Sequence, residues 1–261
     1  MPPHPRDPHH LLIPVANTQE PSAEWAKIRW QRGWDRLTDI ERLLTELRER
    51  MEPPVVWMPA NAPDAPENYH LLDYLTVQDK RNFSLLGSEA IQHLRVALDH
   101  MVYNAGWKHT GKRPENTQFP ITRKTREWTQ ALKRDVLPLT MEQRAWIEAV
   151  QPYNGVDWTK HLQRLSNADK HRYAIEISPA LQMALDQNAA APDPEDPSRL
   201  LIPVQSWDLV LIVIDGDRRN PAKPFLTPMF MQAAVLINRF ADQEGAGRIK
   251  FIPEPGGTTY L

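Results

Sequence analysis

Cysteine is absent from this chain of 261 residues. Without a thiol the protein can form no disulfide bond, no thiolate metal site and no cysteine nucleophile, and this composition suits a reducing compartment. Long apolar runs are also missing, because the longest, LVLIVI at 209–214, is far too short to cross a bilayer. The segment MPPHPRDPHHLLIPV at the start of the chain contains no apolar core of signal-peptide length. We therefore expect a cytoplasmic protein with no membrane partner.

An excess of charge of one sign is lacking as well. Lys and Arg number 31 against 33 Asp and Glu, and this balance lacks the overall basic footprint of a tight nucleic-acid binder. Hydrophobic residues make up 41% of the chain and charged residues 25%, which is typical of a globular protein. The chain is also long enough to bury a substantial core.

Helical periodicity and end signals predict most of the chain's organisation. Residues 1–21, rich in Pro and His, are expected to form a disordered arm. A helix is predicted from Ser22 to about Arg50, and a second from about Asn82 to Ala105 with Gly106 as its stop. Three shorter helices are expected to begin near residue 125, after a capping box at 140–143, and near residue 156.

Strand patterns surround these helices. VVWMP at 55–59 and YHLLDYLTV at 69–77 are predicted to form a hairpin, and YAIEISP at 173–179 and WDLVLIVI at 207–214 alternate as strands do. Thr227 and Pro228 predict the start of a helix that ends by Gly245. The predicted fold class is α+β, a helical bundle core with a smaller antiparallel β-sheet. Its expected parts are a helical core with a β-hairpin at 22–183, a polar loop at 184–199, and strands plus a C-terminal helix packing on the core at 200–261.

The stretch QHLRVALDHMVYNAGW at 92–107 places several polar groups on one helix. At about 100° per residue, His93, His100 and Asn104 share a face, whereas Arg95 and Asp99 lie on the other flank of the apolar stripe. The two histidines lie roughly 10 Å apart along the axis and cannot ligate one metal ion. We expect no metal and no other cofactor. Arg95 and His100 differ by about 140° around the axis, so they converge only if the arginine bends round or a second subunit completes the site.

A second polar cluster is NADKHRY at 167–173, where a helix gives way to a strand. If the helix persists to Arg172, Asn167 and His171 share a face. Asp99 and Arg172 could pair if their two helices pack together. Lys170 adds a further cation to this cluster.

Four segments in order resemble a group of uncharacterised bacterial proteins. They are EAIQHLRVALDHMVY, TQFPI, IEAVQPY and LQRLSNADKHRY, which span residues 88–173, and the group's signatures read approximately LRSALDHLV, FPI, QPY and LNNIDKHR. That group has no established activity, so this resemblance carries no functional assignment.

RVALDH, from Arg95 to His100, also resembles the Arg-x(4–6)-His motif of the HEPN superfamily. Those proteins are helical bundles, and many are metal-independent ribonucleases that act as dimers with motif residues from both subunits. The resemblance implies that His100 takes the proton from a ribose 2′-hydroxyl and that Arg95 stabilises the transition-state charge on phosphorus. His171 is then the candidate second proton carrier.

Candidate substrate-binding residues complete this hypothesis. They are Arg172, Lys170, Asn104 and Asp99. A basic tract from Lys108 to Arg134 contains the interleaved aromatic residues Trp107, Phe119 and Trp128, which could stack on RNA bases. The hypothesis is thus a HEPN-like nucleic-acid-acting protein, in its sharpest form a metal-independent endoribonuclease, with RNA as partner and a homodimer as its assembly.

The alternative is a non-enzymatic binding or scaffold protein whose polar motifs hold helices together. Arg95 and Asp99 are spaced for a helix-surface ion pair, and His100 and Asn104 could be hydrogen-bonded inside the core. The basic tract could be a solvated face and its aromatic residues could be core. An open cleft near the basic tract favours chemistry, whereas a fully bonded and buried environment favours a scaffold.

Overall fold

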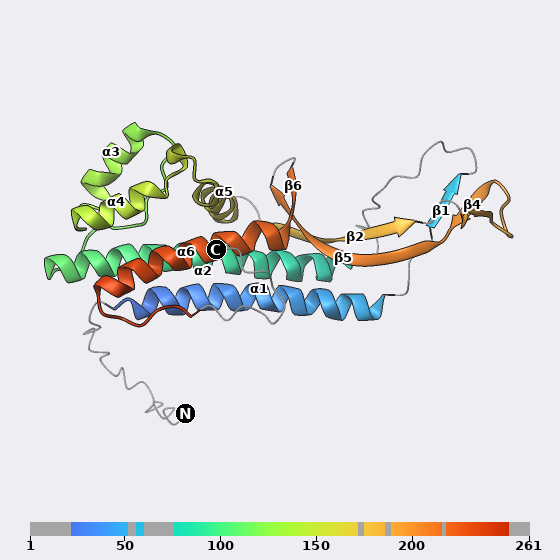
Figure 1. The fold of residues 1–261 in the computed structure, drawn as a ribbon, viewed down its shortest axis with the longest axis horizontal. Helices are drawn as coiled ribbons and strands as arrows, with labels where there is room; N and C mark the ends of the chain where they lie inside the picture. Colours follow the sequence, from blue (N-terminus) through green and yellow to red (C-terminus); the bar gives the residue numbers. More distant parts are fainter. Residues whose placement is uncertain are drawn as a thin grey trace, which may run out of the picture.

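The computed structural model describes residues 22–51, 56–59, 76–171, 175–185, 189–215 and 218–250, and every structural statement below concerns these residues. Their architecture is the predicted α+β class, a helical core with smaller antiparallel sheets (Figure 1). The predicted arm at 1–21 lies outside the described residues.

Two long helices, α1 (Glu24–Arg50) and α2 (Val77–Thr110), run antiparallel, and α6 (Ala222–Gln243) lies along them (Figure 1). Ion pairs between Arg36 and Glu89 and between Arg50 and Asp79 fix the direction of the α1–α2 pair. The three helices meet closely at Gly33, where an added Cβ would lie 2.8 Å from Cε1 of Phe230 and 3.0 Å from the Ala90 carbonyl oxygen. Glycine is required there because any side chain would separate the helices.

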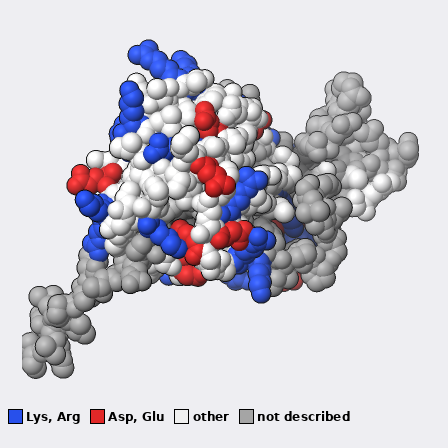
Figure 2. Space-filling model, turned by 60° about the vertical axis from the view of Figure 1, so that its left-hand side comes forward, with Lys and Arg blue, Asp and Glu red and all other residues white. Residues whose placement is uncertain are grey.

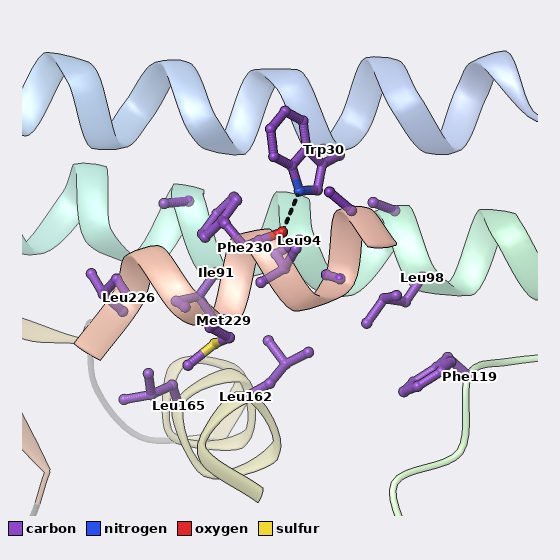
Figure 3. Packing of buried hydrophobic residues seen from close by; sticks show 14 of the residues in the cluster. Trp30, Ile91, Leu94, Leu98, Phe119, Leu162, Leu165, Leu226, Met229 and Phe230 are labelled. Carbon is purple, nitrogen blue, oxygen red and sulfur yellow. Dashed lines mark hydrogen bonds between the residues drawn. The ribbon is translucent and has the colours of Figure 1, made fainter. Parts of the chain in front are cut away.

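The core lies between these three helices and α5 (Asp157–His171) (Figure 3). The apolar face predicted for α2 is buried, as Ile91, Leu94 and Leu98 show. The buried Trp30 indole donates a hydrogen bond of 2.9 Å to the Phe230 carbonyl, which joins α1 to α6 (Figure 3). Satisfying the indole N–H in this way removes the cost of burying it unpaired.

The shorter helices begin within one residue of their predicted starts. They are α3 (Thr125–Arg134) and α4 (Met141–Ala149), followed by a 3₁₀ turn at Pro152–Asn154 and then α5. Thr140 and Gln143 form the predicted capping box, because Thr140 Oγ1 accepts from the Gln143 N–H and the Gln143 side chain accepts from the Thr140 N–H.

The predicted ends of α2 were wrong on both sides. The helix begins five residues early because Thr76 and Asp79 form a capping box. It ends at Gly111, which has a φ of 68°, rather than at Gly106. Gly106 is buried inside the helix, where an added Cβ would lie 2.9 Å from Cβ of Pro138. Its lack of a side chain serves close packing rather than helix termination.

The predicted start of α6 was also wrong. The helix begins at Ala222 rather than at Thr227, and Pro228 lies inside it. Both Pro224 and Pro228 are exposed, so water can satisfy the backbone carbonyls that a proline leaves unbonded. The helix ends at Gln243, just before Gly245 as predicted, and Gly245 has a φ of 66°.

Two antiparallel sheets complete the fold. In one, β4 (Arg199–Ile202) lies between β1 (Val56–Pro59) and β3 (Ala191–Pro192). In the other, β5 (Val204–Asp215) lies between β2 (Glu176–Leu185) and β6 (Arg218–Pro221). β2 and β5 form a long ribbon that extends away from the helices (Figure 1), and Leu209, Leu211 and Val213 are its buried β5 residues.

The sheet predictions hold in part. Segment 207–214 is strand as predicted, whereas the predicted loop 184–199 contains β3 and the end of β2. The described partner of β1 is β4, and residues 69–75, its predicted hairpin partner, lie outside the described part of the chain. Thr76 and Val77, the predicted end of that strand, instead cap and begin α2.

Candidate functional site

A polar cleft of about 370 Å³ lies between α2, α3, α5 and the extended residues 118–122. Most of its lining side chains are amides, hydroxyls or charged groups. They are Arg95, Gln118, Phe119, Pro120, Ile121, Thr122, Glu127, Gln130, Ala131, Arg134, Asp135, Gln163, Ser166 and Asn167.

The extended residues 118–122 form one wall of the cleft and belong to no helix or strand. Side chains of α2 bond the backbone of this segment. The Phe119 N–H donates to Oδ1 of Asp99 at 2.8 Å, and Nη2 of Arg95 donates to the Phe119 carbonyl at 2.6 Å. Arg95 and Asp99 also form an ion pair of 3.1 Å. Phe119 belongs to no helix or strand, so these two side chains provide the hydrogen-bond partners for both its backbone N–H and its backbone carbonyl.

Two glutamines hold the rest of the segment. Gln151 is fully buried. Its Oε1 accepts from the Thr122 N–H at 2.7 Å, and its Nε2 donates to the Pro120 carbonyl at 3.0 Å. Gln163 of α5 donates to the Ile121 carbonyl at 2.8 Å. Four consecutive residues therefore have their backbone bonded by side chains from distant parts of the chain.

These contacts bring together the four segments behind the first sequence resemblance. Arg95 and Asp99 belong to RVALDH, Phe119 to TQFPI, Gln151 to IEAVQPY, and Gln163 to LQRLSNADKHRY. All four segments carry recognisable sequence signatures, but neither glutamine stands out in them. An amide that follows or lies within a helix has many structural roles, so its residue type alone gave no signal.

The histidines of α2 lie in a different environment. His93 and His100 are both half-buried, and burial lowers the pKa of each imidazole below its ordinary value of 6.5. The nearby Arg29 of α1 lowers both pKa values further, while Glu89 and Asp99 raise those of His93 and His100 respectively. The cation that acts most strongly on His100 is therefore on α1, and not Arg95.

Within one chain the two predicted catalytic residues of α2, Arg95 and His100, are directed toward different neighbours. Arg95 is 12% exposed, lines the cleft and bonds the Phe119 backbone. His100 is absent from that lining. Asn104, a predicted substrate-binding residue, is 4% exposed, and its Nδ2 donates to the Ser22 carbonyl at 2.6 Å. Asp99 holds the Phe119 N–H.

The second predicted cluster is described only in part. His171 is the last residue of α5, and Lys170 precedes it in that helix, but the described structure does not include their side chains. Arg172 lies outside the described residues. The roles predicted for these three residues stay predictions.

The basic tract contributes an exposed cationic face on α3 and the residues before it. Arg123, Lys124, Arg126, Lys133 and Arg134 are all exposed. Lys and Arg side chains gather toward the top of the space-filling view (Figure 2), at the height where α3 lies in Figure 1.

The interleaved aromatic residues are mostly core. Phe119 is 0% and Trp128 3% exposed, so the prediction that they stack on RNA bases was wrong. Their role is to anchor the extended segment and α3 to the core. Trp107 is half-buried, and the Arg113 guanidinium lies 4.8 Å from its ring centroid.

The described residues include no group of three or more His, Asp or Glu side chains arranged to hold a metal ion. None of the helices described is both long and apolar enough to cross a membrane. Comparison of the chain with protein-family models, with curated proteins and with solved structures finds no match in any of the three.

Proposed function

We propose that this protein binds single-stranded RNA, whose backbone lies across α3 while one nucleotide enters the cleft. The observation that carries the proposal is a polar cleft that shares its α3 wall with an exposed cationic face. Unstacked bases are recognised by polar groups on their edges, and phosphates are held by Lys and Arg.

The electrostatics of α3 support this proposal. Lys124, Arg126 and Lys133 are exposed, and none of them forms an ion pair with another described residue. The nearby carboxylates are already engaged, because Glu127 accepts from the Arg123 N–H and Asp135 accepts from Arg134. The five exposed cations of this face outnumber its two carboxylates, Glu127 and Asp135, and give α3 a local positive field despite the balanced charge of the whole chain.

The geometry favours binding over cleavage by Arg95 and His100. Nη2 of Arg95 already contacts the Phe119 carbonyl and Asp99, whereas the His100 imidazole lies near Arg29. A proton acceptor and a charge-stabilising group act together only when both reach the same phosphodiester. The non-enzymatic alternative is therefore the one that we propose.

Fluorescence anisotropy with a labelled single-stranded RNA tests the proposal. Each phosphate contact contributes about 0.7 to the slope of log K against log salt for a single strand. The triple variant Lys124→Glu, Arg126→Glu, Lys133→Glu should lose at least tenfold in affinity and lower that slope by about 2. The control variant Arg32→Glu, Arg81→Glu, Arg219→Glu makes the same charge change at exposed positions of α1, α2 and β6, where the cations form no ion pair with another described residue. Equal loss in both variants, or no binding by the wild type, would contradict the proposal.

A metal-independent endoribonuclease is the second candidate. It is favoured by one observation: the lowered pKa of His100 keeps the imidazole neutral near pH 7, as a general base requires. This candidate needs the predicted homodimer, in which Arg95 of a second copy could approach His100.

Its test is incubation of the pure protein with mixed RNA in a chelator, beside His100→Ala and Arg95→Ala. Sedimentation velocity reports the oligomeric state of the same samples. The nuclease candidate is supported if both variants fold but no longer cleave RNA. It is rejected if the wild type leaves the RNA intact, or if both variants cleave RNA as well as the wild type does. Thermal melts are the control for folding, because Arg95 also holds the Phe119 backbone.

A further inference from the structure

The amide side chains that line the cleft fall into two groups. Gln163 donates to the Ile121 carbonyl and accepts from Arg123, and Nε2 of Gln118 donates to Asp135. Gln130 of α3 and Asn167 of α5 are both exposed and line the cleft, yet neither forms a hydrogen bond to another described residue. They are two carboxamides, on different helices bordering one cleft, with both their donors and their acceptors available to a ligand.

The arginines of the cleft are engaged with the protein itself. Arg134 holds Asp135 through two parallel bonds of 2.8 and 3.0 Å. Arg95 uses Nη2 for the Phe119 carbonyl and for Asp99. An arginine guanidinium is the group that pairs best with guanine, and both guanidinium groups of the cleft already bond the protein. A Gln or Asn carboxamide is the group that pairs best with adenine, and the cleft offers two that are available, those of Gln130 and Asn167.

The size of the cleft restricts its occupant. About 370 Å³ lies near the lower end of the range of ligand-binding clefts, which is roughly 300–1,000 Å³. That volume suits one nucleotide and excludes a helical duplex. An occupant must therefore be unstacked from its neighbours, as bases in single-stranded RNA can be.

We propose that the cleft receives one unstacked adenine and that Gln130 and Asn167 pair with its N6 and N7 edge or its Watson–Crick edge. This inference rests on the proposed RNA-binding function and specifies which nucleotide the cleft selects. The cations of α3 contribute affinity for every sequence, whereas the two carboxamides contribute the choice of base.

The experiment compares four labelled oligouridine strands that differ only in one central nucleotide, which is A, C, G or U. Fluorescence anisotropy should give about tenfold tighter binding for the strand with A, since one bidentate amide–base pair discriminates by roughly that factor or more. Gln130→Ala and Asn167→Ala should each remove most of that preference and should change the affinity for the all-U strand far less. Gln232→Ala, an exposed position on α6, is the matched control and should keep the preference.

Titration calorimetry with adenosine monophosphate separates this inference from the proposed function. Tight binding of all four strands without a preference for A overturns the adenine inference and leaves RNA binding intact. Binding of adenosine monophosphate that requires Gln130 and Asn167, with no binding of any RNA, overturns the RNA proposal and keeps the adenine site. An A preference that survives both alanine variants also overturns the inference, because the selection would then come from other residues.

Discussion

On one flank of α2, Arg95 and Asp99 bond the backbone of the extended residue Phe119; on the other, His93 and His100 lie half-buried beside α1. The first two residues form an ion pair of 3.1 Å and have fixed partners at short distance. The second pair is held toward its neutral form by burial and by Arg29. Polar residues on two flanks of one helix thus have different roles, because one flank meets unpaired backbone groups and the other meets cations.

This difference shows what the cleft requires. An extended segment without a sheet partner is stable inside a protein only if side chains replace the missing ladder of hydrogen bonds. The cleft wall at 118–122 therefore depends on the polar residues around it, whereas the histidine flank does not. Variants on the two flanks should therefore differ in how much they lower the free energy of unfolding and in how that loss depends on pH.

The largest effect is expected for Gln151→Ala. The change leaves the Thr122 N–H and the Pro120 carbonyl without their partner and should lower the free energy of unfolding by about 3–5 kcal/mol, since each unsatisfied group costs about 1–3 kcal/mol. Urea denaturation measures this loss. The comparison variant Gln163→Ala removes one bond to the wall backbone, at the Ile121 carbonyl, and an exposed bond from Arg123, and should cost about 1–2 kcal/mol. Equal losses would show that the wall does not depend on the number of bonds to its backbone.

A smaller effect is expected for Asp99→Ala, at about 2–3 kcal/mol, because the Phe119 N–H loses its acceptor and Arg95 its carboxylate. Asp99→Asn keeps an acceptor oxygen and should recover about half of that loss. Urea denaturation of the two variants side by side separates the backbone bond from the ion pair. If asparagine were as damaging as alanine, the charge on Asp99 would matter more than its bond to Phe119.

The smallest change in the free energy of unfolding at neutral pH is expected for the double variant His93→Gln, His100→Gln. Both folded-state pKa values lie below 6.5, so the unfolded chain binds more protons than the folded one as the pH falls through this range. The stability that the neutral histidines contribute is present above pH 6.5 and is lost as the pH falls through their folded-state pKa values. The charged groups that act on them are Arg29, Arg32, Arg36, Glu89 and Asp99, from α1 and α2.

Urea denaturation between pH 7.5 and 5 measures this dependence. Wild type should lose stability below pH 6.5, and the double variant should lose less. Identical pH profiles would mean that these histidines titrate alike in the folded and unfolded chain. Other titrating groups, including Glu244, whose pKa burial raises, are common to both proteins and cancel in the difference.

Much of the fold follows from local signals in the sequence. The apolar face of α2 and the capping box at Thr140 lie within a few residues of the structure that they specify, and both were predicted correctly. The error at the C-terminal end of α2 arose because Gly106 serves a distant partner. Gly106 resembles a helix stop, yet it is glycine because Pro138 packs against it, and sequence alone does not show that contact.

The candidate site was predictable only as separate parts. The spacing of Arg95 and Asp99 indicated an ion pair, which forms, but their common bond to residue 119 depends on a segment some 20 positions away. The separation of Arg95 from His100 followed from helix geometry alone. Asn167 was noted only as sharing a helix face with His171, and Gln130 was not singled out. The carboxamides of both are available because the neighbouring polar side chains bond one another, and the sequence does not show those bonds.

The hydrogen bond from Trp30 to the Phe230 carbonyl joins residues 200 positions apart. During synthesis the first helix therefore emerges from the ribosome long before the backbone that accepts its indole proton. Until then the faces of Trp30 and Gly33 that pack against Phe230 remain uncovered, and transiently exposed apolar surface of this kind promotes aggregation. Newly made chains should consequently be most vulnerable to aggregation and proteolysis in the interval before α6 is released.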